Sequence, residues 1–290
     1  MQQDVLQFAQ IAIAGLTNGA IYALVALGFS LVFAVSGYVN LMQGEFVVLG
    51  GLVAIALSEA GMPLPVVLIG AVLATTAFAV VVQGLVLSPN RNLSADAALI
   101  ITIGAALVAR GIAMLLFGKD PLSLAAFSGE RPIFLGPVPI STQSLWISGT
   151  LLAATLALWC FFRLTYIGKA MMACAQSPVG ARLVGINLAF VSLVTFATSA
   201  ALGALAGAVV APLTLITFDE GLNFGIKGFI AAVFGTLGSF PGAVVGGLAL
   251  GLMESFVSGY VSSQYRDAFA FCAVLLLLLV RQRGSTSRNR

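Results

Sequence analysis

The stretch RLTYIGKAMMACAQSPVGARLVGIN, residues 163–187, interrupts a chain that is otherwise strongly apolar. It carries three cations, Arg163, Lys169 and Arg182, and it is broken at Ser177-Pro178. A charged side chain at the centre of a membrane span costs at least about 2.5 kcal/mol. We therefore expect this stretch to lie outside the bilayer and to separate the spans before it from those after it.

The whole chain has the composition of a membrane protein. Of its 290 residues, 60% are hydrophobic and 8% are charged, and the mean hydropathy is +1.09. Soluble domains average about 45–50% apolar and about 25% charged residues. The 32 glycines favour close helix packing in lipid, where small residues let backbones touch. We predict an all-α polytopic membrane protein with about eight transmembrane helices and a single domain, residues 1–290.

Polar breaks in the apolar pattern set the expected order of the helices. The charge-free run between Asp4 and Glu45 would form a helix of about 60 Å, twice the roughly 30 Å hydrocarbon core, so we place a break at 36–40. The run 225–237 is too short to span and predicts a re-entrant or half helix buried among other helices. Four prolines make 118–143 an extended external loop. The expected spans are 5–35, 43–58, 66–87, 95–117, 144–164, 188–216, 241–260 and 267–280.

The distribution of basic residues predicts the orientation. Cations gather on the cytoplasmic side of membrane proteins. With the basic tail 281–290 inside, the N-terminus and Asp4 lie outside, and 163–187 becomes a cytoplasmic loop. Eight cations then lie inside and four outside. The inner set is Arg91, Arg163, Lys169, Arg182, Arg281, Arg283, Arg288 and Arg290, and the outer set is Lys119, Arg131, Lys227 and Arg266.

Residues 177–185 have the pattern of a short helix: a serine N-cap, a proline at the first helical position and a glycine stop. Val179 and Leu183 are four residues apart, so they share one face, beside Arg182. A helix this short is not stable alone in water. It therefore predicts a docking element for a cytosolic partner; the alternative is an interfacial loop whose charges only fix the topology. The candidate docking residues are Ser177, Pro178, Val179, Arg182, Leu183 and Gly185.

Small residues recur at four-residue spacing in several of the expected helices. Such faces allow close helix contacts in a membrane. They serve either as static packing surfaces or as smooth faces on which helices slide during transport. The predicted helix-packing residues are Gly15, Gly19, Gly203, Gly207, Gly238, Gly242, Gly246, Gly247 and Gly251, with Ser199 and Ala211 on the same stripe as Gly203.

Charged and polar residues inside the apolar runs indicate a cavity or a partner. Glu254 lies deep in its segment and Arg110 is the basic residue without an evident partner, so we expect a buried Arg110–Glu254 pair. Glu45 begins a helix, where the dipole favours an acid. Other polar residues either line a pathway or form hydrogen bonds between helices. The possible pathway residues are Asn18, Tyr22, Asn40, Gln43, Glu45, Thr102 and Asn223.

Several function classes are disfavoured. The chain has no histidine, its three cysteines are far apart, and no metal or other cofactor is predicted. No G-x-x-x-x-G-K-[ST] phosphate loop is present, so ATP hydrolysis by that route is excluded. An intramembrane Ser-His enzyme is excluded, and the aspartates all lie near span ends. An ion-coupled secondary carrier for small polar solutes is the alternative, although Glu254 is the one acid deep in a predicted span that could take part in a proton relay.

Three ordered motifs resemble one known family. GLTNGAIYALVALGFSLVFAVSGYVNLMQGEFVVLGG (15–51), GKAMMACAQSPVGARLVGIN (168–187) and GIKGFIAAVFGTLGSFPGAVVGGLALGLMES (225–255) resemble the permeases of branched-chain amino-acid ABC importers. The resemblance covers most of the chain, and urea and short-amide permeases are near relatives.

That resemblance implies a multi-pass subunit in the bacterial inner membrane that is not itself an enzyme. It implies a second homologous permease, two cytoplasmic ATPase subunits docked on the loop 163–187, and a periplasmic substrate-binding protein. The bilayer is the remaining partner, and no nucleic acid is expected. Branched-chain or related amino acids are the implied substrates, and urea or amides are the alternative.

Overall fold

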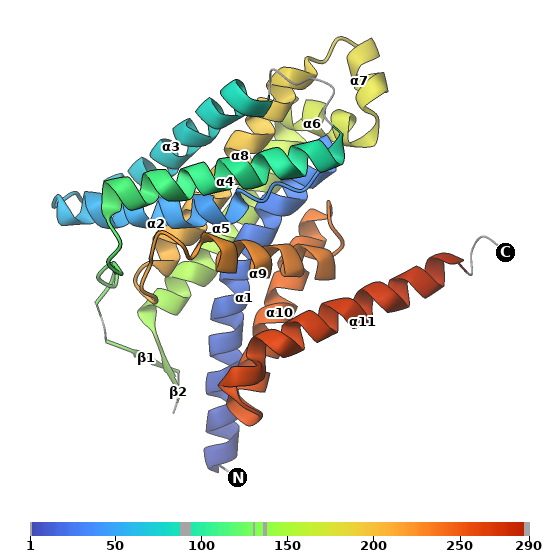
Figure 1. Ribbon diagram of the computed structural model, residues 1–290. Helices are drawn as coiled ribbons and strands as arrows, with labels where there is room; N and C mark the ends of the chain where they lie inside the picture. The colour runs from blue at the N-terminus through green and yellow to red at the C-terminus, as the bar shows by residue number, and fades with distance from the viewer. Residues whose placement is uncertain (1, 88–93, 130, 136–137, 287–290) are drawn as a thin grey trace.

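The computed structural model describes residues 2–87, 94–129, 131–135 and 138–286 (Figure 1). Arg91 and residues 287–290 of the predicted basic tail lie outside these ranges, and the backbone of 281–286 continues the last helix. The helices are α1 (Gln2–Ser36), α2 (Gln43–Glu59), α3 (Leu64–Val82), η1 (Gln83–Leu87), α4 (Ala95–Phe117), α5 (Thr142–Leu164), α6 (Tyr166–Gln176), α7 (Pro178–Leu183), α8 (Leu188–Val210), α9 (Gly221–Phe234), α10 (Phe240–Tyr260), η2 (Ser263–Tyr265) and α11 (Arg266–Thr286). Two short strands are β1 (Ile133–Leu135) and β2 (Val138–Ile140).

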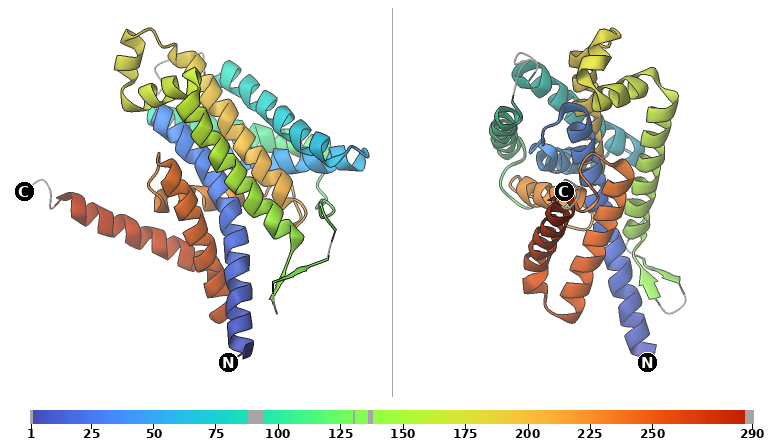
Figure 2. Two further views of the ribbon diagram at one scale, coloured as in Figure 1. Left: turned by 180° about the vertical axis from the view of Figure 1, so that it is seen from behind. Right: turned by 90° about the vertical axis from the view of Figure 1, so that its right-hand side faces the viewer.

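The helix α1 is the centre of the bundle. It packs along α10 and α8 and also contacts α5 and α9. In its most apolar window 78% of the residues are buried, compared with 17% in α4, so α1 lies inside and α4 at the periphery. Figure 2 shows α1 crossing the bundle from the N-terminus to the end that holds α6 and α7, while α11 projects away from the other helices.

Six of the described helices are long and apolar enough to cross a membrane: α1, α3 with η1, α4, α5, α8 and α10. We expected about eight. The 17 residues of α2 extend only about 25 Å, less than the hydrocarbon core, and most of them are buried inside the protein. The helix α11 is not among the six either. The short apolar helix predicted at 225–237 is present as α9, with 14 residues, but it begins four residues earlier, at Gly221.

The connections confirm some predicted breaks and correct others. The break after Ser36 is present, and Gly37 there has a φ of +76° that glycine readily adopts. The span predicted to reach residue 216 ends at Val210, two residues before Pro212, because a proline in a helix interior removes a backbone hydrogen bond. Residues 211–213 form a turn, and Ile216 exchanges two backbone hydrogen bonds with Leu122 of the predicted external loop.

Both predicted loops contain regular structure. Residues 118–143 hold the antiparallel hairpin β1–β2, in which Ile133 pairs with Ile140. Residues 163–187 are mostly helical, because α6 precedes the short helix that the sequence predicted. Thr165 begins α6 by accepting a hydrogen bond from the backbone N–H of Gly168, and good helix formers such as alanine and methionine follow.

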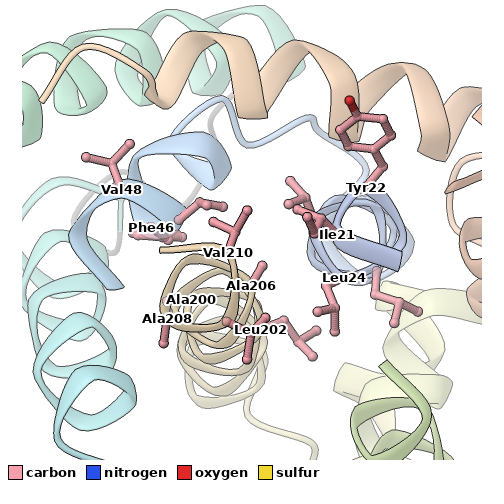
Figure 3. Close-up of a cluster of buried hydrophobic side chains, with 14 of the residues drawn as sticks. Ile21, Tyr22, Leu24, Phe46, Val48, Ala200, Leu202, Ala206, Ala208 and Val210 are labelled. Atoms are coloured by element: carbon pink, nitrogen blue, oxygen red, sulfur yellow. The ribbon is translucent and has the colours of Figure 1, made fainter. Parts of the chain in front are cut away.

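Small residues of α8 let three helices meet closely. Figure 3 shows Ala200, Ala206 and Ala208 of α8 between Phe46 of α2 on one side and α1 on the other. Phe46 and Phe196 pack edge to face with centroids 5.5 Å apart. In the same view Tyr22 points away from the labelled cluster, which sets it apart as a polar residue with partners elsewhere (Figure 3).

Candidate functional site

The short helix α7 has the local structure that residues 177–185 predict. The Ser177 hydroxyl accepts a hydrogen bond from the backbone N–H of Gly180 at 3.0 Å, and Pro178 is the first helical residue. Gly185 lies just past the helix with a φ of +86°, a conformation that costs a residue with a Cβ atom. The cap, the proline and the glycine therefore fix where α7 begins and ends.

The helix α7 projects an apolar face into the surroundings. The side chains of Val179 and Leu183 are 71% and 83% exposed, and Arg182 beside them is exposed as well. The buried residue of α7 is Ala181, which packs into a small apolar cluster on α1, α6 and α8. The other buried members of that cluster are Leu31, Met171, Cys174 and Val191. One face of α7 thus rests on the bundle and the other is open to a partner.

The predicted small-residue faces lie at close helix contacts. A Cβ atom at Gly19 or Gly15 would lie 2.8 or 2.9 Å from a Cα atom of α10, and one at Gly247 or Gly251 would meet α1 at 2.4 or 2.2 Å. Such distances exclude any larger side chain without a shift of the backbone. Gly203 and Gly207 of α8 face α2, and Gly242 and Gly246 of α10 face α9. Gly238 differs, because it lies in the connection before α10 with a φ of +86°.

The predicted pair of Arg110 with Glu254 is wrong. Arg110 of α4 instead donates from Nη2 to Glu45 Oε1 of α2 at 2.7 Å. The Glu45 side chain is 4% exposed and that of Arg110 is 24% exposed. Glu45 is therefore the acid of a largely buried ion pair, and its position in the first turn of α2 is additionally favoured by the helix dipole.

Glu254 belongs to a second charged cluster. Its Oε2 accepts a hydrogen bond from the Tyr22 hydroxyl at 2.8 Å and one from Lys227 Nζ at 3.2 Å. Lys227 Nζ also donates to Tyr22 Oη at 3.3 Å and to Asp267 Oδ1 at 3.1 Å. Arg266 Nε lies 3.7 Å from Glu254 Oε2. This cluster connects α1, α9, α10 and the start of α11.

Two of the possible pathway residues are fully buried in polar contacts of the protein. The Gln43 amide nitrogen donates to the backbone oxygen of Ser199 at 3.1 Å, and its side chain lies where a Cβ atom of Gly28 would be. Asn40 Oδ1 accepts from the backbone N–H of Met42, whereas its Nδ2 has no hydrogen-bond partner among the described residues. Gln43 is thus a packing residue that joins α2 to α8.

The other polar candidates lie in different places. Thr102 is buried in α4, where its hydroxyl donates to the backbone oxygen of Leu99 at 2.9 Å. Asn18 is half-buried in α1. Asn223 is exposed in the first turn of α9 and donates to Glu220 at 2.9 Å. The structure therefore does not gather all the predicted pathway residues into one site.

Sequence reasoning missed the partners of the two charged clusters. Lys227 had been assigned to the outer edge, although it is the one charge in the apolar run 225–237, and that isolation is a signal of a buried partner. Asp219 had been read only as part of a turn. The position of Lys227 next to the buried Glu254 could not be deduced from the sequence, because it depends on how α9 packs between α1 and α10.

The chemistry available in these clusters is electrostatic. In the part of the chain that the structure describes, no three Asp, Glu, Cys or His side chains gather as metal ligands. Among the described residues the ion pairs form two clusters, Arg110 with Glu45 beside the first turn of α9 and the cluster around Lys227 of α9 itself. Figure 1 shows α9 lying between the end of the bundle that holds α7 and the end that holds the N-terminus.

Comparison with known proteins shows which family this chain matches. The family described as branched-chain amino acid transport system, permease component, matches residues 11–280. The high-affinity branched-chain amino acid transport system permease protein LivH of Salmonella typhimurium is 32% identical over 304 aligned positions, which cover 99% of this chain and 98% of that protein. The corresponding protein BraD of Pseudomonas aeruginosa is 30% identical, with 98% and 97% covered. The ribose import permease protein RbsC of Escherichia coli is 27% identical, with 91% and 83% covered.

Proposed function

The chain belongs to the permease component family of branched-chain amino acid transport systems, and from this premise we propose that it is the membrane-spanning subunit of an ATP-driven ABC importer. It is a multi-pass membrane permease and not a catalytic subunit. The proposed cargo is a branched-chain or related amino acid, released by a periplasmic binding protein and delivered to the cytoplasm across the inner membrane.

The observation that carries this proposal is the helix α7. It is a six-residue helix with its own cap and stop, and its exposed face holds Val179, Arg182 and Leu183. The bundle supports only the Ala181 face of this short helix, so its exposed apolar face is left for a further docking surface. We assign that surface to an ATPase subunit, because the sequence contains no phosphate-binding loop of its own.

The orientation follows from the same helix. The cations Arg163, Lys169 and Arg182 lie at or beside the end of the bundle that holds α6 and α7 (Figure 2). The N-terminus and the hairpin β1–β2 lie at the opposite end (Figure 1). Cations favour the cytoplasmic side, so the proposal places α7 inside the cell, the hairpin outside, and two ATPases beneath this permease and a homologous partner permease.

The glycine faces between α1 and α10 would allow the two helices to move relative to each other during transport. Contacts made by Gly15, Gly19, Gly247 and Gly251 bring the two backbones together without interlocking side chains. We propose that α10 shifts along α1 during transport. The same contacts also hold the resting bundle together.

The test of the function is reconstitution. The permease is purified with the products of its neighbouring genes, placed in proteoliposomes, and assayed for uptake of labelled leucine, ribose and urea with and without ATP. ATP-dependent uptake of an amino acid that requires the loaded binding protein is the expected result. Uptake driven by a proton or sodium gradient, without a bound ATPase, contradicts the proposal.

The docking role of α7 has its own test. Arg182→Glu reverses a charge on the exposed face, and Gly185→Pro removes the positive φ that ends the helix. Both are expected to abolish co-purification of the ATPase while membrane insertion persists. Lys169→Glu is the matched control, because it reverses an exposed charge on the neighbouring α6. Normal assembly of both α7 variants contradicts docking at this helix.

A further inference from the structure

The guanidinium of Arg110 has unused hydrogen-bonding capacity in the middle of an apolar helix. Arginine carries five N–H donors, and the described part of the chain supplies one acceptor, Glu45 Oε1 at 2.7 Å. Nε is buried without a partner, while the side chain as a whole is 24% exposed. We propose that Arg110, Glu45 and Asp219 form a binding site for a zwitterionic α-amino acid, with the substrate carboxylate on Arg110 and its ammonium group on Asp219. This inference rests on the proposed function and names the residues that would hold its substrate.

Glu45 holds Arg110 in place from one side. A Cβ atom at Gly221 would lie 2.3 Å from Glu45 Oε2, and one at Gly44 would meet the backbone oxygen of Gly221. Two glycines therefore let the first turns of α2 and α9 come together around the carboxylate. Because Glu45 engages Nη2 and Nε is buried, the N–H groups of Nη1 and the second N–H of Nη2 are the donors left for a second carboxylate, which guanidinium groups bind with charge-assisted hydrogen bonds.

Asp219 supplies a negative charge near this site, because Gly221, two residues further on, packs against the Glu45 carboxylate. It lies two residues before Gly221, is exposed, and makes no ion pair among the residues that the structure describes. The Thr217 hydroxyl donates to its Oδ1 at 2.6 Å. That hydrogen bond, with a smaller effect of the nearby Arg110 charge, holds the pKa of Asp219 below its usual value. An ionised carboxylate within electrostatic range of Arg110 is what the ammonium group of an amino acid requires.

The charges of the site favour amino acids over neutral solutes. The family relatives include permeases named for branched-chain amino acids and for ribose. A sugar or urea has no group to neutralise Asp219 and no carboxylate for the free edge of Arg110. A site built around charged partners rejects analogues that leave those partners unpaired. The apolar side chains that surround Arg110 on α4 then suit an aliphatic side group.

The experiment measures substrate binding to the permease without the binding protein. The purified transporter in nanodiscs is assayed by scintillation proximity with tritiated leucine. The competitors are leucinamide, which lacks the carboxylate; 4-methylpentanoate, which lacks the ammonium group; and ribose. Saturable leucine binding is expected, with 4-methylpentanoate competing better than leucinamide and with no competition by ribose.

Three variants separate the roles. Arg110→Gln is expected to weaken leucine binding roughly 10- to 100-fold, the value of a charge-assisted hydrogen bond. Asp219→Asn is expected to weaken leucine binding roughly threefold to fivefold, while the affinity for 4-methylpentanoate is unchanged. Glu45→Gln removes the competing carboxylate but keeps an acceptor for Nη2, so leucine binding becomes tighter. Arg131→Gln, an exposed cation of the external loop, is the control without effect.

If Arg110→Gln weakens leucine binding and Glu45→Gln strengthens it, these opposite changes in affinity cannot both come from a general loss of folding. Equal binding of leucine and leucinamide, unchanged binding in Arg110→Gln, or weaker binding in Glu45→Gln overturns the site. Absence of saturable leucine binding in the wild type also overturns it. If ATP-driven amino acid uptake persists in any of these cases, the proposed function stands and only this site is lost.

Discussion

The two charged clusters, Arg110 with Glu45 and Lys227 with Glu254 and Asp267, differ in how many N–H donors of Arg110 and Lys227 have protein acceptors. Lys227 has three N–H donors, and three acceptors surround it: Tyr22 Oη, Glu254 Oε2 and Asp267 Oδ1 at 3.1–3.3 Å. Arg110 has five donors and one protein acceptor among the described residues. We call the lysine cluster closed because each donor of Lys227 has a protein acceptor, although Glu254 Oε1 has no hydrogen-bond partner among the described residues, and we call the arginine site open because Arg110 has donors left over.

This difference indicates different roles for two pairs that look alike in the sequence. A cation whose donors are all matched by side chains from α1, α10 and α11 holds those elements together. A cation with free donors beside an exposed carboxylate can accept a ligand. The comparison predicts that changes at Lys227 act mainly on stability and that changes at Arg110 act mainly on transport.

The largest loss of stability is expected for Lys227→Met. It leaves the Glu254 carboxylate, 1% exposed, without its nearest cation. Removing one partner of a buried pair typically costs about 3–5 kcal/mol, and the remaining cation, Arg266 at 3.7 Å and 41% exposed, compensates only part of the Glu254 charge. We expect a large drop in the thermal unfolding temperature of the purified protein in detergent, followed by fluorescence-detected size-exclusion chromatography.

A second change at Glu254 distinguishes a charge effect from lost packing. Lys227→Met with Glu254→Gln removes both charges, so most of the stability is expected to return. Lys169→Met on the exposed face of α6 is the control and stays close to wild type. A single variant Lys227→Met that unfolds like wild type would remove the distinction between the closed and the open cluster.

The next largest effect acts on the open site alone. In Gly221→Ala the new Cβ atom lies 2.3 Å from Glu45 Oε2, so the carboxylate must move away from Arg110. Overpacking of this kind costs about 1–3 kcal/mol, and leucine uptake falls with it. Gly111→Ala is matched to it, because that glycine is next to Arg110 and has open space around it. Equal behaviour of the two alanine variants would contradict the tight contact between α2 and α9.

Much of the architecture could be predicted from the sequence. The polar break at 36–40, the short helix at 225–237 and the cap and stop around 177–185 are all local signals, and the structure has the matching feature at each. The family could be recognised for the same reason, since its motifs are continuous in the chain. The sequence predicts about eight spans, and six described helices are long and apolar enough to cross a membrane. Apolar composition alone does not distinguish a buried 17-residue helix such as α2 from a helix that crosses lipid.

The charged clusters could not be predicted, because each depends on contacts between distant segments. Glu45 and Arg110 are 65 residues apart, and Tyr22 and Glu254 are 232 residues apart. The sequence identified Arg110 and Glu254 as charges in need of partners, which is correct. It paired them with each other because the partners Glu45 and Lys227 each had a simpler explanation, as a helix start and as an outer-edge cation.

A smaller effect on stability is expected for Arg110→Lys. Lysine keeps the positive charge and one hydrogen bond to Glu45, and Arg110 makes one such hydrogen bond in the described structure. We therefore expect the unfolding free energy to change by about 1 kcal/mol or less. Lysine lacks the planar fork that binds a carboxylate on two donors. The expected result is near-normal thermal stability with a raised KM for leucine. A stability loss as large as that of Lys227→Met would mean that both clusters are structural.

The smallest effect concerns Asp267, the outermost member of the lysine cluster. Its side chain is 62% exposed, so Asp267→Asn should cost less than about 1 kcal/mol at neutral pH. The hydrogen bond from Lys227 holds the pKa of Asp267 below its ordinary value of 3.8. A carboxyl whose pKa is lowered by folding stabilises the protein above its unfolded pKa, and this contribution is lost as the pH falls through the folded value. A protonated Asp267 resembles asparagine, so the small difference in unfolding temperature between wild type and Asp267→Asn should be constant above about pH 4 and disappear below it. A difference that persists in acid would show that Asp267 acts through packing rather than through its charge, and the closed cluster would then end at Lys227.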